Sequence, residues 1–420
     1  KNWTTAICRN SGLLKSYLSL KIERQIMHKL FVNLRYFLTP TLILLALLGI
    51  VIGGNWVWTG IGLFIASIIL DTVSSAMKGV HCAPPGRDDD GETYGIAGLL
   101  KAMMWIQYPV FVCLQGALIW RVYEYANGVP FSVSTYGWLE IQHGITGLQL
   151  YAATVSAGIY LGLGIMFGHE LAHTKGPTFV LARWMMALSG IAHFCYAHVY
   201  NHHLELGCED DPATSPRGRN IYKHYLLSHF GQSRFLFIME KQRLQKLGIP
   251  FISWQNRWIR GYAMSLPSIF FFWLAGGWLG LGVMVASWVI SAFELEVLNY
   301  LEHYGLIREK GQPIDYRHSW DVAESPFTQW GFIEIGRQAD HHDRGETHFW
   351  ELENCDAPDT HYGYYAMFAM ILVPPVWEAF IKPHLADWDE NRASEGEKKI
   401  AAKMNYKAGW HDMTLCQKPD

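Results

Sequence analysis

The sequence predicts an all-α integral membrane protein, with about six transmembrane helices and a polar, histidine-rich helical region on the cytoplasmic side. Hydrophobic residues make up 50% of the 420 positions and charged residues only 17%, against roughly 25% in an average soluble domain. Long apolar runs recur along the chain, and a helix of ~20 such residues crosses a bilayer. Between these runs, eight of the 19 histidines fall into four tight groups.

Four of the expected spans lie in the N-terminal half, after a basic segment at residues 1–35 that holds seven Lys or Arg and one acid. The spans within residues 36–168 are Tyr36–Gly53, Trp56–Val73, Met103–Val122 and Gly147–Gly168. The first two are joined by Gly54-Asn55, which predicts a helical hairpin with a very short turn. The last is rich in Gly and Ala, a composition that favours close helix packing in membranes.

A second tight hairpin is predicted at residues 261–293, on either side of Gly276-Gly277. Its arms are Tyr262–Ala275 and Trp278–Phe293. Each arm is short for a bilayer, so we expect tilt or local thinning of the membrane. The hairpin separates two histidine-rich regions, residues 169–260 and 294–390, which together form the expected catalytic region.

Two further apolar stretches are not counted as spans. If Phe179–Tyr196 crossed the membrane, His169 and His198 would lie on opposite sides and could not share a site. Tyr364–Phe380 is interrupted by two prolines, which favours a re-entrant or interfacial helix over a seventh span. Residues 391–420 form a polar, charged tail.

Basic residues indicate which side of the membrane each region faces. Residues 169–260 hold eleven Lys or Arg and residues 294–420 hold twelve, whereas the loops at the opposite ends of the spans hold almost none. By the positive-inside rule, the histidines and both termini face the cytoplasm, in what we expect to be a bacterial inner membrane. The net charge of −3 gives no indication of nucleic acid as a partner. The seven cysteines form no Cys-x-x-Cys pair, which excludes a zinc ribbon or a rubredoxin motif within the chain.

The grouped histidines have the spacing of metal ligands. His169 and His173 lie four residues apart, so on a helix they share one face, and His198 and His202 repeat that spacing. The eight candidate ligands are His169, His173, His198, His202, His203, His303, His341 and His342. One ion rarely takes more than about four protein ligands, so eight imidazoles predict two ions.

A zinc protease is the competing interpretation of His169-Glu-Leu-Ala-His173, with two His ligands and Glu170 as the base. That interpretation leaves six of the clustered histidines without a role. Burying so many imidazoles without metal would leave many ring nitrogens to satisfy, so we favour the two-metal site.

Four other residues have candidate roles around the metal. Glu170, Glu302 and Asp340 lie directly beside ligand positions, where a carboxylate that accepts the far ring N–H would orient the imidazole. The competing interpretation of each is a solvated surface charge. Trp58, in the second span, is a candidate for the wall of a substrate tunnel, against the commoner interfacial or packing role.

These motifs resemble those of the integral-membrane non-haem diiron hydroxylases and desaturases. His169-Glu-Leu-Ala-His173-Thr looks like the first His box, and His198-x-x-x-His202-His203 looks like the second box of the hydroxylases. Asn299-Tyr-Leu-Glu-His303-Tyr-Gly-Leu is similar to the additional motif of alkane hydroxylases, and Asp340-His341-His342 to the end of the third box. Within the family, the resemblance is to alkane 1-monooxygenase and to the membrane subunit of xylene monooxygenase, from about Leu34 to the C-terminus.

The resemblance implies that the eight histidines hold two iron ions, which activate O2. It implies hydroxylation of an unactivated terminal or benzylic methyl group of an n-alkane or alkyl-aromatic hydrocarbon to a primary alcohol. It also implies that electrons come from an external rubredoxin or a ferredoxin-type reductase, and that the apolar substrate arrives from the membrane lipid.

One position departs from the family pattern. The third box of the hydroxylases usually begins with His, three residues before the His pair, and Gln338 stands there in this chain. By this resemblance, Gln338 is a candidate weak ligand, either through its amide oxygen or through a water that it holds. Because Gln is found there in some desaturases, a lipid or fatty acid desaturase with the same metal chemistry is the alternative function. A membrane metal sensor that has lost catalysis is a third.

Overall fold

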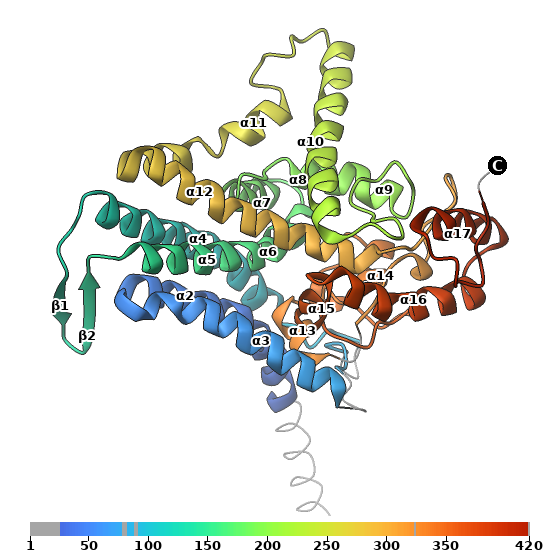
Figure 1. The fold of residues 1–420 in the computed structure, drawn as a ribbon, viewed down its shortest axis with the longest axis horizontal. Coiled ribbons are helices and arrows are strands. Elements are labelled where there is room, and N and C mark those ends of the chain that lie inside the picture. Colours follow the sequence, from blue (N-terminus) through green and yellow to red (C-terminus); the bar gives the residue numbers. More distant parts are fainter. Residues whose placement is uncertain (1–25, 78–81, 88–90, 323–324, 419–420) are drawn as a thin grey trace, which may run out of the picture.

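The computed structural model describes residues 26–77, 82–87, 91–322 and 325–418, and these are mostly helical. Most of the basic N-terminal segment lies outside the described residues. Five of the described helical segments are long and apolar enough to cross a membrane: Ile26–Ile52, Gly54–Ala76, Ala97–Ala126, Gly147–Ala172 and Arg257–His303. They run side by side in Figure 1, and the histidine-bearing elements gather at one end of the bundle.

The first two segments form a hairpin with a turn that requires glycine. After the short turn η1 (Arg35–Phe37), α2 (Leu38–Ile52) ends at Gly53, and the 3-10 turn η2 (Gly54–Trp58) leads into α3 (Thr59–Ala76). Gly53 has a φ of 82° and Gly54 a φ of 55°, left-handed conformations that glycine adopts without steric cost. A Cβ at Gly53 would also collide with the Arg121 side chain.

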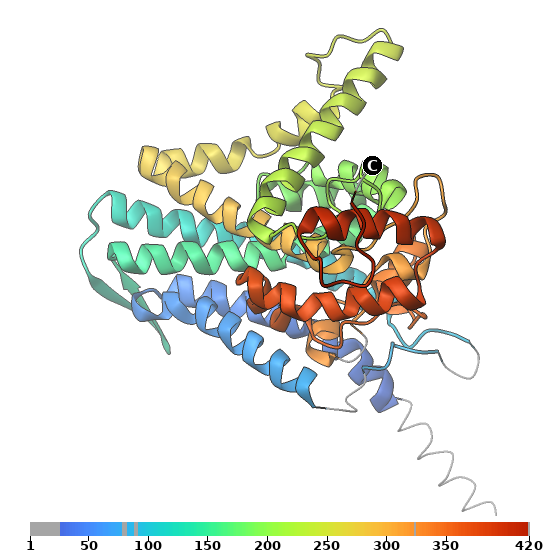
Figure 2. The ribbon, with the colours of Figure 1, turned by 45° about the vertical axis from the view of Figure 1, so that its right-hand side comes forward.

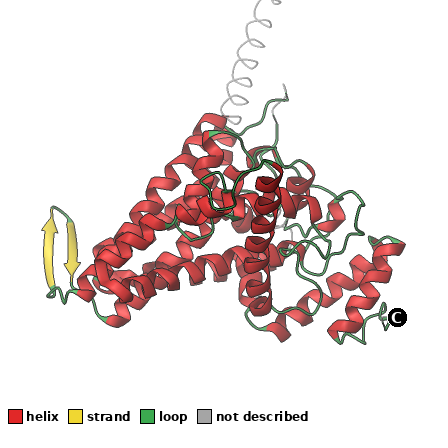
Figure 3. Cartoon of the chain, turned by 90° about the horizontal axis from the view of Figure 1, so that it is seen from above, coloured by secondary structure: helices red, strands yellow, loops and turns green. Residues whose placement is uncertain are grey.

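A short β hairpin joins the third and fourth segments. α4 (Ala97–Ala126) leads into β1 (Ser132–Tyr136) and β2 (Leu139–His143), which pair antiparallel before α5 (Gly147–Leu163) begins. The buried Arg121 guanidinium holds this end together, because it donates to the carbonyl of Gln142 at 2.9 Å and to that of Ile50 at 2.8 Å. Figure 3 shows the hairpin at the end of the bundle away from the polar helices.

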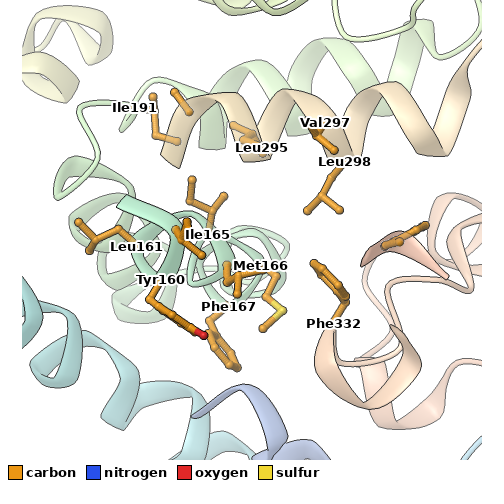
Figure 4. Packing of buried hydrophobic residues seen from close by; sticks show 14 of the residues in the cluster. Tyr160, Leu161, Ile165, Met166, Phe167, Ile191, Leu295, Val297, Leu298 and Phe332 are labelled. Carbon is orange, nitrogen blue, oxygen red and sulfur yellow. The ribbon is translucent and has the colours of Figure 1, made fainter. Parts of the chain in front are cut away.

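The helices α5 and α12 (Leu266–His303) pack in close contact through glycine. Gly158 and Gly162 lie four residues apart on α5, and a Cβ on either would overlap Ile290 or Glu294 of α12. This is the small-residue spacing that lets membrane helices approach closely, as the Gly and Ala content of the span predicts. Apolar side chains of α5, α6 and α12 fill the adjoining space in Figure 4.

The fifth segment folds back on itself inside α12. Gly276 (φ −154°, ψ 19°) and Gly277 (φ 55°, ψ −130°) are non-helical, and they separate a short first arm from a long second arm. A Cβ on Gly280 would overlap the carbonyl oxygen of Phe272, so the two arms lie against each other at the bend. Figure 2 shows this fold-back, which lies at the hairpin expected around Gly276-Gly277.

The polar region consists of short helices around the end of α12. α6 (Ile165–Ala172) continues α5 after Gly164, and α7 (Pro177–Ala187) has 11 residues, too few to cross a bilayer. The elements that follow are α8 (Phe194–Ala197), the π-helical turn η3 (His198–His202), α9 (His203–Glu205), α10 (Ile221–Lys246), α11 (Arg257–Ala263), η4 (Tyr316–His318), α13 (Pro326–Gly331), α14 (Gln338–Asp343), η5 (Phe349–Glu351), α15 (Tyr364–Ile371), α16 (Pro374–Asn391) and α17 (Glu395–Ala408). Prolines at the start of α16 divide the Tyr364–Phe380 run into two helices.

Candidate metal centre

The eight candidate histidines lie together, in two adjoining groups. The first group consists of His169, His173, His198, His203 and His341, and the second of His202, His303 and His342. Within each group the candidate ligand atoms all lie within 4.8 Å of one another. The elements that carry them are α6 with the residue that follows it, η3, α9, the end of α12, and α14. Segments far apart in the sequence therefore meet at one buried site.

The π-helical turn η3 decides which imidazoles share a group. The spacing in the sequence predicts that His198 and His202 point to one face of a helix. Instead, the backbone N–H of His203 donates to the carbonyl of His198, five residues back, so the turn is one residue wider than an α-helical turn. His198 and His203 consequently face the first group, with their Nε2 atoms 3.0 Å apart, and His202 faces the second.

The rings of the second group form a nearly regular triangle. The ring centroids lie 4.9 Å apart for His202 and His303, 5.0 Å for His202 and His342, and 4.9 Å for His303 and His342. The two groups touch where the rings of His203 and His342 lie 4.3 Å apart. Two metal sites at these groups would therefore be neighbours within one cavity of imidazoles.

The donor set fits metal ions. His198 Nε2 lies 3.1 Å from His173 Nε2 and 3.0 Å from His203 Nε2, so three ring nitrogens converge at one point. A neutral imidazole has one N–H and one acceptor nitrogen, so hydrogen bonds among these rings cannot satisfy every ring nitrogen. Other ring nitrogens are buried without a hydrogen-bond partner in the described part of the chain; they are His198 Nδ1, His202 Nε2, His341 Nε2 and His342 Nδ1. Unpaired acceptors on converging imidazoles are the arrangement that a cation satisfies.

Burial keeps these imidazoles neutral, the form that binds metal. Desolvation, together with repulsion from neighbouring imidazoles, holds the pKa of His173, His198, His203 and His342 well below the usual value. The same causes lower the pKa of His341 to about 4. The ring nitrogens therefore need not lose a proton at neutral pH before a metal binds.

A carboxylate orients one ligand of the second group. Asp211 Oδ2 lies 2.8 Å from Nδ1 of His202, on the side of the ring away from the other ligands, and Thr214 and the backbone N–H of Ala213 also donate to the carboxylate. Burial raises the pKa of the Asp211 carboxyl, but its partners, His202 first, outweigh burial and hold the pKa below its usual value. Asp211 therefore fixes the His202 tautomer that leaves Nε2 free for metal.

The three carboxylates expected to orient ligands make other contacts among the described residues. Glu170 accepts from the backbone N–H of Phe349 at 3.2 Å. Asp340 binds Arg344 Nε at 2.7 Å and accepts from the backbone N–H of Glu353 at 2.8 Å. The bonds from the backbone N–H groups of Phe349 and Glu353 tie adjacent loops to the histidine helices. The place of each carboxylate in sequence, beside a ligand on a helix, turns its side chain away from the neighbouring ring.

Glu302 remains close to the second group. Its Oε2 accepts from the amide of Gln338 at 3.1 Å and lies 4.0 Å from His303 Nε2. The hydroxyl of Tyr364 lies 3.5 Å from its Oε1. Glu302 thus acts on the second group through Gln338 rather than by holding an imidazole N–H.

A sequence model of the fatty acid desaturase family matches residues 146–371, more than half of the chain and all of the histidines described above. The chain belongs to the fatty acid desaturase family.

The similar proteins in this family are monooxygenases. The hydroxylase component of xylene/toluene monooxygenase from Pseudomonas putida is 30% identical over 385 residues, which cover 90% of this chain and 96% of that protein. Alkane 1-monooxygenase 1 from Pseudomonas aeruginosa is 32% identical over 313 residues, or 71% of this chain and 76% of the relative. Alkane 1-monooxygenase from Pseudomonas putida is 27% identical over 338 residues, or 74% and 81%. This desaturase-family chain is therefore a membrane-bound oxidoreductase of the monooxygenase class.

Gln338 lies beside the three imidazoles of the second group, next to His303 and His342. Its amide nitrogen lies 3.2 Å from His342 Nε2 and 3.5 Å from His303 Nε2, and its amide oxygen is buried without a partner among the described residues. An amide can turn end for end without changing shape. The turned amide would direct its oxygen to His342 and His303, and it would give up the bond that the amide nitrogen now makes to Glu302 Oε2. The Gln338 side chain therefore lies at the second group, where its position in the family's third box predicts a metal ligand.

Asp211 was not predicted, because it lies in a loop that reads as a surface connection, and no spacing rule links it to His202. Trp58 is not brought to the metal centre: it lies in η2, 36% exposed, where α2 turns into α3 near the β hairpin.

Proposed function

We propose that this membrane monooxygenase hydroxylates an unactivated terminal or benzylic methyl group of a hydrophobic hydrocarbon, with O2, at a centre of two non-haem iron ions. The observation that carries the proposal is the pair of adjoining imidazole groups at one end of an apolar helix bundle. Imidazole suits iron, and two groups within one buried site suit two ions. The names of the relatives, xylene/toluene and alkane monooxygenases, support a hydrocarbon substrate.

The residues of the chain divide the work. Bound iron would supply O2 activation, the chemistry that side chains lack. The first group would hold one ion, and the second group would hold the other, with the Gln338 amide oxygen as a weak fourth donor. Asp211 holds His202 in the ligand tautomer, and burial of the ligands excludes bulk water.

Substrate and electrons reach the centre from different sides. An apolar substrate enters from the lipid between the spans, whereas the ligands lie at the polar end of the bundle, which we place on the cytoplasmic side of a bacterial inner membrane. The reaction consumes two electrons and two protons as one oxygen atom enters the C–H bond and the other leaves as water. We propose a rubredoxin or a ferredoxin-type reductase as the donor, since the sequence contains no cysteine cluster of its own.

The test is product analysis of cells that express the chain with a rubredoxin–reductase system. n-Octane and p-xylene are supplied together under 18O2, and the products are separated by gas chromatography. We expect 18O-labelled 1-octanol, 4-methylbenzyl alcohol or both, with two irons per chain by metal analysis. The variant His202→Ala is the inactive control, and His28→Ala, at an exposed position, is the matched active control.

Other products would contradict the proposed hydroxylation and would support one of the alternatives. Alkenes without label, formed from membrane lipid acyl chains, would establish the desaturase alternative, for which Gln338 is the observation in the sequence. Iron at full occupancy with no product from any donor would favour a sensor.

A further inference from the structure

A short turn of the chain, η4 (Tyr316–His318), lies against the second histidine group. The carbonyl oxygen of His318 lies 3.4 Å from Nδ1 of His303. A carbonyl oxygen only accepts hydrogen bonds, so Nδ1 carries the ring proton and Nε2 is left free for metal. The backbone of His318 therefore fixes the tautomer of His303, as the carboxylate of Asp211 fixes that of His202.

Trp320, two residues further along, holds the backbone on both sides of His303. Its backbone N–H donates to the carbonyl of Glu302 at 2.8 Å, and its indole N–H donates to the carbonyl of Tyr304 at 2.9 Å. Both carbonyls lie at the end of α12, where the helix itself offers no further N–H groups. The ring of His303 and its backbone are thus both fixed by the chain around η4.

The same turn is attached to the helix that carries His341 and His342. The hydroxyl of Tyr316 donates to Oδ2 of Asp343 at 3.1 Å. Asp343 is the last residue of α14 and directly follows His342. η4 therefore connects two of the elements that meet at the second group, the end of α12 and α14.

Two buried side chains of the C-terminal helices hold η4 in place. Nδ1 of His318 accepts from the backbone N–H of Asp315 at 2.9 Å, so the ring proton is on Nε2, which donates to Oε1 of Glu397 at 2.9 Å. The indole N–H of Trp388 donates to the carbonyl of Arg317 at 2.7 Å. Glu397 belongs to α17 and Trp388 to α16, and both side chains are buried.

Attachment of α17 to the rest of the protein does not by itself require the bond between His318 and Glu397. The helix already buries apolar residues, among them Ala401 and Ala402. Carboxylates are rarely buried, and a well-packed apolar pair often stabilises a protein as much as a buried polar pair does. A hydrogen bond has a direction, however, so this pair fixes the orientation of residue 318, which apolar packing would define less well.

We propose that Glu397 and Trp388 are positioning residues of the second histidine group, which act through the backbone of η4 to keep the carbonyl of His318 on Nδ1 of His303. The inference rests on the proposed function, because it concerns the ion that the second group would bind. It makes α16 and α17 part of the support of the metal centre, although their residues lie outside both histidine groups. Without these contacts, His303 would have to be ordered when metal binds.

The test is anaerobic titration of detergent-purified apoprotein with Fe2+, in which we expect two binding steps for the wild type. Glu397→Leu should weaken one step by roughly tenfold, the lower end of the range for groups that orient metal ligands, and leave the other step unchanged. Glu397→Gln keeps an oxygen that can accept from His318, so it should restore part of the affinity. Trp388→Phe, which removes one hydrogen bond and retains an aromatic ring, should weaken the same step. Glu395→Leu, at an exposed position of α17, is the matched control and should change neither step.

Two further variants identify the affected step. His303→Ala removes a ligand of the second group and His173→Ala a ligand of the first, so each should retain one binding step. Adding Glu397→Leu should leave the remaining step of His303→Ala unchanged and should weaken that of His173→Ala by roughly tenfold. Equal weakening in both backgrounds would show a general loss of stability and would overturn the inference. If Glu397→Leu does not fold, Trp388→Phe takes its place in both combinations.

Product analysis of the same variants separates this inference from the proposed function. Weakening confined to the second group, in a wild-type protein that binds two ions but gives no hydroxylated product, supports the positioning role and overturns the proposed function. Hydroxylation by the wild type, with both binding steps unchanged in Glu397→Leu and Trp388→Phe, overturns the inference and leaves the proposed function standing. A wild-type protein that binds no metal ion overturns both.

Discussion

Oδ2 of Asp211 lies 2.8 Å from Nδ1 of His202, while Nε2 of the same ring is buried and has no hydrogen-bond partner among the described residues. The two ring nitrogens of His202 therefore have different roles: Nδ1 bonds to Asp211, and Nε2 is free to bind a metal ion. One anchors the imidazole to a loop, and the other faces the second histidine group. A ligand that is fixed before metal arrives pays little to be ordered when metal binds.

Asp211→Ala should weaken metal binding without unfolding the protein. The orienting bond on His202 is lost, and outer carboxylates of this kind typically contribute roughly 10- to 100-fold in metal affinity or activity. Iron titration of the apoprotein measures the effect, with the neighbouring exposed Asp210→Ala as the control. Equal iron affinity in the Asp211 and Asp210 variants would mean that the bond does not orient the ligand.

Removing a histidine from one group should cost the protein the metal ion of that group and leave the ion of the other group bound. We expect His303→Ala to abolish hydroxylation and to reduce the iron content from two ions per chain toward one, because His303 is one of three imidazoles in the second group. His173→Ala should do the same from the first group, which has five. Metal analysis of the purified variants is the measurement, and full activity in either removes that residue from the ligand set.

Gln338→His should keep or raise activity. The amide already lies 3.2 Å from His342 Nε2, and an imidazole is a stronger donor to iron than an amide oxygen. Gln338→Leu, which has no donor atom, is the matched control and should lose iron from the second group. Complete loss of activity in Gln338→His would show instead that the site requires the amide and its contact with Glu302.

The pair formed by His318 and Glu397 predicts a pH-dependent contribution to stability. Burial raises the pKa of the Glu397 carboxyl. The hydrogen bonds from His318 Nε2, at 2.9 Å, and from the backbone N–H of Ser394 lower the pKa by more, so that it falls to about 2. Because the folded pKa is below the unfolded value, the stabilisation is complete above about pH 4.5 and is lost as the pH falls toward the folded value. The difference in melting temperature between wild type and Glu397→Gln should therefore shrink with acidification, and a constant difference would contradict the assignment.

The glycines of α5 give a test of helix packing. Gly158→Ala should destabilise the protein by about 1–3 kcal/mol, because the new Cβ would lie 2.8 Å from Cβ of Ile290. Gly116→Ala on α4 is the control, since a Cβ there meets nothing within 4 Å, and this change should stabilise by roughly 0.5–1 kcal/mol through helix propensity. Thermal unfolding in detergent measures both; equal effects would mean that α5 and α12 are not in tight contact.

Much of this architecture could be predicted from the sequence because the responsible signals are local. Runs of apolar residues indicate the spans, and Gly54-Asn55 and Gly276-Gly277 indicate the two tight turns. The first turn begins one residue earlier than predicted, at Gly53. The histidines stand out because four short motifs carry eight of them. For these features, composition and spacing within a few residues contain the information.

The rest depends on contacts or backbone geometry that spacing does not encode. His198 pairs with His203 rather than with His202 because η3 is a π-helical turn, and i, i+4 reasoning assumes a regular α-helix. Asp211 reaches His202 through a loop, and Asp340 turns to Arg344 instead of a ligand.

The wide turn η3 also limits how this centre could be transferred to another protein. If the same residues formed a regular α-helix, His203 would lie about 140° round the helix from His198, because each residue turns the helix by about 100°. His203 and His198 could then not face the same group, although all eight histidines would still be present in the chain. A designer who copies the ligands into another helical bundle must therefore copy the additional residue as well, because it sets the phase between the two halves of the site.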